Sequence, residues 1–265
     1  MKQRIISAVI GLAIFLPILV KGGRIFAWAI LFLSFIALYE IAKMKKISFF
    51  NEIGLISCFA MASIVLPNYY YQIILPLSQP VFMFYVAAML LLVLTVYRYQ
   101  IFNFVDAATL IFAALYIGSG FRFLIQIRDE GLATIIYLFL VIWMTDTGAY
   151  LFGRTFGKHK LASHISPNKT IEGAIGGIAT ALLFSMIYAW IFELDIRHRQ
   201  WLPLLTILIS ISGQFGDLVE SAYKRHFNVK DSGYFLPGHG GVLDRFDSSI
   251  FAAIMFMVWQ SISKF

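Results

Sequence analysis

Acidic side chains and glycines gather directly before the last strongly apolar stretch of the chain. Residues 230–247 read KDSGYFLPGHGGVLDRFD, and SSIFAAIMFMVWQSIS follows. Asp244 and Asp247 share one face if a helix begins here. Their oxygens suit Mg²⁺, which proteins bind through one or two carboxylates together with substrate phosphates. Because glycines such as Gly240 and Gly241 let a main chain approach a ligand closely, the segment predicts a phosphate-and-metal loop that leads into a membrane helix.

A polar helix face is predicted just before this loop. This face consists of Asp217, Glu220, Ser221 and Lys224. Their spacing of i, i+3, i+4 and i+7 places them on the same side of a helix. The ordinary alternative is a helix surface that is simply solvated. That alternative does not account for the glycines that follow, so we interpret the face as part of the same polar site.

A further acid lies inside a strongly apolar segment. Asp146 opens the motif DTGAYLFGRTFG, and Arg154 lies within that motif. A charged side chain within a membrane is costly and is a functional candidate by default. The alternative is a hydrogen bond between Asp146 and a neighbouring helix.

The motif SPNKTIEG carries the signals of a helix start. Ser166 suits an N-cap, Pro167 suits the first helical position, and Asn168 and Lys169 follow. The free N–H groups and positive dipole end of a helix favour phosphate. Capping alone is the alternative, but it leaves Lys169 unexplained.

The composition identifies an integral membrane protein. The 265 residues are 60% hydrophobic and 13% charged, whereas a soluble domain carries about 25% charged residues. The net charge of +7 does not indicate a nucleic-acid partner, because the basic residues lie in short loops between apolar runs. The single cysteine, Cys58, excludes an internal disulfide.

The apolar runs predict an all-α, polytopic fold with about nine transmembrane helices, each needing about 20 residues to cross a bilayer. The predicted spans are 5–20, 24–42, 47–66, 73–97, 104–127, 132–152, 171–192, 201–222 and 246–263. Asn51 and Glu52 interrupt the third. We divide the chain into N-terminal helices over 1–130 and a C-terminal catalytic region over 131–265.

The distribution of Lys and Arg predicts the orientation. Most of them fall on one side if the N-terminus is cytoplasmic. Loops 153–170 and 223–245 then face the cytoplasm, and an odd number of spans places the C-terminus outside.

The polar loop and the helix before it resemble the signature of phosphatidate cytidylyltransferases, also called CDP-diacylglycerol synthases. The matching positions are Ser221, Lys224, Arg225, Lys230, Asp231, Gly233, Leu236, Pro237, His239, Gly240, Gly241, Asp244, Arg245 and Asp247. SPNKTIEG and DTGAYLFGRTFG are similar to family motifs as well. The resemblance is strong from about Trp143 to Asp247, whereas the N-terminal half matches only as a set of spans.

The resemblance implies an Mg²⁺-dependent membrane enzyme, commonly a homodimer, that transfers CMP from CTP to phosphatidate and releases pyrophosphate. It implies that Asp217 and Asp244 hold the metal, and it leaves open a monovalent cation such as K⁺ beside it. The catalytic residues would be Asp217, Lys224, Arg225, Asp244 and Asp247. The substrate-binding residues would be Asp146, Arg154, Ser166, Asn168, Lys169, Ser221, Lys230, Asp231, His239, Gly240, Gly241 and Arg245. Such an enzyme is expected in the inner membrane of a bacterium, where it serves phospholipid biosynthesis.

Two other functions are weighed against this one. A CTP-dependent lipid kinase would share the nucleotide but phosphorylate a lipid alcohol, and the intact loop signature argues against it. An ion or phosphate transporter would favour inverted repeats and interrupted helices at mid-membrane. Here the charges gather at one face and the sequence shows no repeat.

Overall fold

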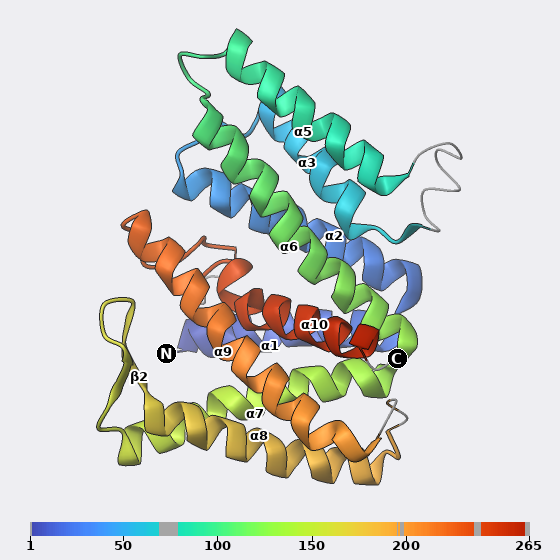
Figure 1. The fold of residues 1–265 in the computed structure, drawn as a ribbon, viewed down its shortest axis with the longest axis vertical. Coiled ribbons are helices and arrows are strands. Elements are labelled where there is room, and N and C mark those ends of the chain that lie inside the picture. Colours follow the sequence, from blue (N-terminus) through green and yellow to red (C-terminus); the bar gives the residue numbers. More distant parts are fainter. Residues whose placement is uncertain (1, 69–78, 195, 197–198, 236–239, 263–265) are drawn as a thin grey trace. The chain divides into compact units, whose positions relative to one another are not determined.

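The protein is described by a computed structural model, which covers residues 2–68, 79–194, 196, 199–235 and 240–262. In these ranges the helices are α1 (Lys2–Lys21), α2 (Gly23–Met44), α3 (Glu52–Val65), α5 (Pro80–Tyr97), α6 (Phe104–Glu130), α7 (Leu132–Phe156), α8 (Ile171–Ile191), α9 (Leu202–His226) and α10 (Leu243–Ile262) (Figure 1). A 3₁₀ turn, Arg199–Trp201, precedes α9. The two short strands are β1 (Lys160–Ala162) and β2 (Ser166–Thr170).

The prediction of a helical integral membrane protein is confirmed. A helix occupies each of the predicted apolar segments, and within the described residues six helices are long and apolar enough to cross a bilayer. These six are α2, α5, α6, α7, α8 and α9.

The third predicted span is shorter than expected. The predicted segment was 47–66, but α3 has only 14 residues and begins at Glu52. The reason is local, because the Asn51 side chain accepts hydrogen bonds from the N–H groups of Ile53 (3.0 Å) and Gly54 (3.4 Å). Asn51 thus caps the helix and sets its start.

The chain divides into two compact units. The first comprises Met1–Gln126 and Val229–Asp244, and the second comprises Ile127–Asn228 and Arg245–Phe265. The predicted polar loop therefore folds with the N-terminal helices, whereas the helix face that precedes it in sequence belongs to the second unit.

In the first unit, an arginine within α6 closes the end of α3. Arg122 donates hydrogen bonds to the carbonyl of Ile64 (3.3 Å) and to the side-chain oxygen of Asn68 (2.9 Å). The last carbonyls of a helix have no partner within the helix, so a charged donor from a neighbouring helix stabilises this end. These contacts explain why a basic residue, Arg122, lies inside a predicted span.

In the second unit, α7 and α8 run side by side and approach closely (Figure 1). A β-carbon on Gly177 would collide with the carbonyl of Thr145, and one on Gly148 would collide with Thr180. Glycines at both positions therefore permit this helix contact, as small residues do in membrane interfaces generally.

A hairpin joins α7 to α8 and corrects one sequence prediction. β1 and β2 pair antiparallel, with Lys160 opposite Thr170 and Ala162 opposite Ser166. Ser166 therefore lies in a strand, and the prediction that it is an N-cap is wrong. Thr170 takes that role, since its hydroxyl oxygen accepts from the N–H of Gly173 at 3.1 Å. Pairing of the hairpin strands holds Ser166 away from the helix start.

Candidate active site

An ion pair links the hairpin to α9. The Nζ of Lys169, on β2, lies 2.6 Å from Oδ2 of Asp217, on α9. The other carboxylate oxygen, Oδ1, accepts a hydrogen bond from Ser221 Oγ at 3.3 Å. About a third of the Asp217 side chain and a quarter of the Lys169 side chain stay exposed, at 33% and 28%. The pair is therefore open on one side to a further charged group.

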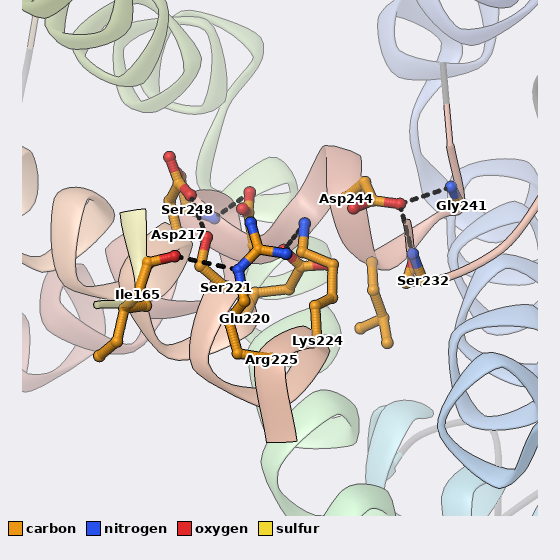
Figure 2. A network of polar contacts seen from close by, with 12 residues as sticks. Ile165, Asp217, Glu220, Ser221, Lys224, Arg225, Ser232, Gly241, Asp244 and Ser248 are labelled. Carbon is orange, nitrogen blue, oxygen red and sulfur yellow. Dashed lines mark hydrogen bonds and ion pairs between the residues drawn. The ribbon is translucent and has the colours of Figure 1, made fainter. Parts of the chain in front are cut away.

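The predicted polar face of α9 is formed as the spacing indicated. Ser221 contacts Asp217 and Lys224 pairs with Glu220, each partner one helical turn away. Glu220 is buried, with 3% of its surface exposed, so the ammonium group of Lys224 compensates a buried carboxylate. Figure 2 shows these four side chains projecting from the same stretch of α9.

Two further acids add to this charge cluster. The Asp146 carboxylate, on α7, interacts electrostatically with Asp217, Lys169 and Arg245. The Asp247 carboxylate, on α10, interacts with those of Asp217 and Asp146 and with Lys224. Four acids thus share one region with three bases, and the charge cluster consists of Asp146, Asp217, Glu220, Asp247, Lys169, Lys224 and Arg245. Such a region attracts anions to its bases and cations to its acids.

Close packing brings α10 against α9 at this cluster. A β-carbon on Gly216 would collide with the main-chain oxygen of Asp247. The Oδ1 of Asp247 in turn accepts a hydrogen bond from the N–H of Ser248 at 2.6 Å. Gly216 is therefore needed for the approach of the two helices that carry Asp217 and Asp247.

A small pocket lies beside Asp146. Its lining residues are Ile142, Thr145, Asp146, Ile209, Ser210, Gly213 and Ser248, and its empty volume is about 150 Å³. That volume includes space open to solvent, and the enclosed part has almost no room even for a water molecule. This pocket is therefore too small to enclose a nucleotide.

Other predicted site residues of this unit lie at its surface. Arg225 donates through Nε to the carbonyl of Ile165 at 3.3 Å, so it links α9 to the turn of the hairpin. Arg154 is exposed and donates to the hydroxyl of Tyr150 at 3.3 Å. Asn168 is exposed, and Ser166 is half-buried.

In the first unit, Asp244 organises the polar loop. Its Oδ2 accepts hydrogen bonds from the N–H of Ser232 (2.9 Å), the hydroxyl of Ser232 (2.9 Å) and the N–H of Gly241 (2.8 Å) (Figure 2). Gly240 has φ +82°, and a β-carbon there would collide with the Asp244 carboxylate. Glycine is therefore required at this position for both conformation and space.

The rest of the loop is exposed or outside the described residues. Lys230 and Asp231 are exposed to solvent. His239, predicted to bind substrate, falls in 236–239, outside the described residues.

One acid of this unit was missed by the sequence analysis. Glu40, on α2, is buried and accepts hydrogen bonds from the loop. The signal that could have found it is the one applied to Asp146, an acid inside an apolar helix.

The carboxylate oxygens of the site are the candidate ligands of a metal ion. Among the described residues, no three or more His, Cys, Asp or Glu side chains are arranged to hold a metal ion. Mg²⁺ needs fewer protein ligands, because it keeps waters and substrate phosphates in its shell. Asp217 already accepts a cation, the Lys169 ammonium, and stays partly exposed. Its oxygen chemistry therefore fits a hard divalent ion.

The helices and the charge cluster define a polytopic membrane protein with a polar site suited to phosphate groups. The sequence model of the Cytidylyltransferase family matches residues 2–263, and the chain belongs to this family. It is similar to curated proteins named phosphatidate cytidylyltransferase. These relatives come from Staphylococcus aureus strain COL (47% identical), Staphylococcus epidermidis strain ATCC 12228 (48%) and Staphylococcus saprophyticus (46%). Each match covers 254 residues, 95% of this chain and 95% of the relative.

Proposed function

We propose that the protein is a phosphatidate cytidylyltransferase, which transfers CMP from CTP to phosphatidate and yields CDP-diacylglycerol and pyrophosphate. The observation that carries this proposal is the identity of 46–48% over 95% of both chains to relatives of that name. The charge cluster around Asp217 supports it, because the reaction joins two anionic substrates. The product is a precursor in phospholipid biosynthesis.

The chemistry requires positioning more than proton transfer. An oxygen of the phosphatidate phosphate bonds to the α-phosphorus of CTP, and the bond from that phosphorus to pyrophosphate breaks. The attacking phosphate monoester is mostly ionised at neutral pH, because its second pKa is about 6. It therefore needs little help from a general base. The harder task is to bring the anions together and to stabilise the leaving pyrophosphate.

The bases of the charge cluster suit this task. Lys169, Lys224 and Arg245 each interact with an acid of the cluster and can turn to substrate phosphates instead. We assign direct roles in the reaction to Asp217, Lys224, Arg225, Asp244 and Asp247. We assign substrate binding to Asp146, Arg154, Ser166, Asn168, Lys169, Ser221, Lys230, Asp231, His239, Gly240, Gly241 and Arg245.

We assign Mg²⁺ to Asp217 and Asp244, with K⁺ as a candidate second ion. When bound, Mg²⁺ neutralises the phosphate charge that builds up during the transfer. Asp217 would exchange its contact with Lys169 for the metal. Lys169 would then be released toward the phosphates.

The membrane topology follows from the charge distribution. We propose nine spans in the inner membrane of a bacterium, with the N-terminus and loops 153–170 and 223–245 in the cytoplasm. CTP is a polar cytoplasmic solute, so the site must open on that side and sideways to the lipid. The catalytic region lies mainly in 131–265, and the active protein is a homodimer.

One assay tests the function and separates it from its alternatives. Purified protein in detergent is given phosphatidate, Mg²⁺ and CTP labelled on either the α- or the γ-phosphate. A cytidylyltransferase places the α-label in the lipid and the γ-label in pyrophosphate. A lipid kinase supplied with diacylglycerol or another lipid alcohol places the γ-label in the lipid, and a transporter labels no lipid. Full turnover in excess EDTA would refute the metal assignment without touching the function itself.

A further inference from the structure

A buried glutamate in the second helix holds the start of the last helix. Glu40 lies in α2 with 2% of its surface exposed. Its Oε1 accepts a hydrogen bond from the N–H of Val242 at 2.8 Å, and its Oε2 accepts one from the N–H of Leu243 at 2.9 Å. Leu243 is the first residue of α10, and Val242 is the residue before it. A carboxylate from a distant part of the chain thus caps this helix.

Physical chemistry explains why an acid suits this place. The first N–H groups of a helix have no partner within it and carry a positive partial charge. A carboxylate offers two acceptor oxygens, and each here meets a separate N–H. A buried charge is tolerated only when it is bonded in this way. Glutamine could not replace it fully, since its amide nitrogen would oppose an N–H with another donor.

The same glutamate reaches Asp244 through one hydroxyl group. Ser232 Oγ lies 3.0 Å from Glu40 Oε2 and 2.9 Å from Asp244 Oδ2. The hydroxyl has a single hydrogen, so the two carboxylates share it. Any shift of Glu40 therefore changes the bonding of Asp244, which the proposed reaction uses.

The loop is shaped to admit this side chain. A β-carbon on either Gly233 or Gly241 would collide with the Glu40 carboxylate. Three residues beyond Glu40, the Nζ of Lys43 lies 5.5 Å from the ring centre of Tyr234, a contact in the range of cation–π attraction. The end of α2 therefore contacts the loop at two places, through the buried Glu40 and through the exposed Lys43.

We propose that Glu40 is a positioning residue for the reaction, which fixes the side chain of Ser232 and the main chain of Val242 and Leu243 so that Asp244 meets the substrates in one orientation. The inference rests on the proposed function for its catalytic consequence, but not for its structural one. A residue that merely stabilised the fold would lower the yield of folded protein. A positioning residue also changes the loop and the turnover of the protein that does fold.

Cysteine labelling tests the structural step without any assay of activity. Val242 is 2% exposed, so a Val242→Cys thiol in a Cys58→Ala background should react slowly with a water-soluble maleimide. Adding Glu40→Gln should raise the labelling rate about tenfold. The loss of a hydrogen bond to a charged group should raise the exposed population of residue 242 on the order of 10-fold or more. Glu52→Gln is the matched control. This glutamate pairs with Arg98 at an exposed site in the same unit, so the rate should not change.

Turnover per folded molecule tests the catalytic step. With Glu40→Gln, kcat should fall on the order of 10- to 100-fold, whereas thermal unfolding in detergent stays within a few degrees of the parent protein. If Glu40→Gln does not fold, Ser232→Ala takes its place, and its labelling rate and kcat should shift in the same directions by about threefold or more. Unchanged labelling in the folded variant would overturn the proposal. Absence of cytidylyl transfer in the parent protein would refute the proposed function instead, and the labelling rates would still decide the role of Glu40 in the loop.

Discussion

The ammonium group of Lys169 lies 2.6 Å from a carboxylate oxygen of Asp217, and this contact joins the hairpin before α8 to the polar face of α9. Both side chains keep part of their surface open. In the proposed reaction this pair exists before the metal binds. Lys169 then contacts Asp217, the acid to which the metal is assigned. Each partner can therefore be tested alone.

Replacement of Lys169 tests its role toward phosphate. Lys169→Ala should lower kcat/KM for CTP or for phosphatidate by about 10-fold or more, because a charged hydrogen bond is lost. Stability should change little, since partly exposed ion pairs contribute about 0–1 kcal/mol. Lys160→Ala, on the neighbouring strand, is the control. Equal kcat/KM in both variants and the parent would return Lys169 to a structural role.

The two proposed metal ligands should behave alike in turnover but differently in structure. Asp217→Asn and Asp244→Asn should each reduce kcat by about 100-fold or more. Only Asp244→Asn should also speed labelling of a Val242→Cys thiol, since Asp244 bonds Ser232 and Gly241 whereas Asp217 bonds Lys169 and Ser221. Asp129→Asn, at the exposed end of α6, serves as control. A variant that keeps more than about a tenth of the parent kcat would exclude that carboxylate as a direct ligand.

Buried hydroxyl groups in the second unit should contribute to stability and not to catalysis. Tyr137 OH lies 2.7 Å from Thr206 Oγ1, which is also 3.3 Å from Ser185 Oγ. Tyr137→Phe should lower the free energy of unfolding by about 0.5–2 kcal/mol, the range for hydrogen bonds between membrane helices. Denaturation in detergent measures this, with Tyr85→Phe at an exposed site as control. A large loss of kcat at unchanged stability would contradict a purely structural role.

The orientation of the chain can be tested by labelling intact cells. In a Cys58→Ala background, His159→Cys and Tyr234→Cys should react only after the membrane is made permeable, and His198→Cys should react from outside. Tyr234 is chosen because it is 80% exposed, whereas its neighbour Ser232 is 3% exposed and would label poorly in either orientation. Reaction of Tyr234→Cys from outside would invert the proposed topology and remove access to cytoplasmic CTP.

Much of this protein could be predicted from local sequence. Long apolar runs with few charges specify membrane helices, because a bilayer requires each span to satisfy its own backbone hydrogen bonds. The spacing of Asp217, Ser221, Glu220 and Lys224 correctly predicted a shared polar face of one helix, since helix geometry is regular. The acids and glycines near Asp244 likewise indicate a polar loop, because these residue types favour turns and contact with polar ligands.

The tertiary structure decided what depends on residues far apart in the chain. Ser166 has the residue type of an N-cap, yet strand pairing with Ala162 leaves that role to Thr170. No local pattern relates Glu40 to Val242 or Leu243, because about two hundred residues separate them. Such contacts arise only when packing brings a buried acid to free N–H groups, and burial then makes the contact obligatory. The sequence by itself therefore determined the class of protein and the composition of its site, whereas folding decided which side chains hold that site in place.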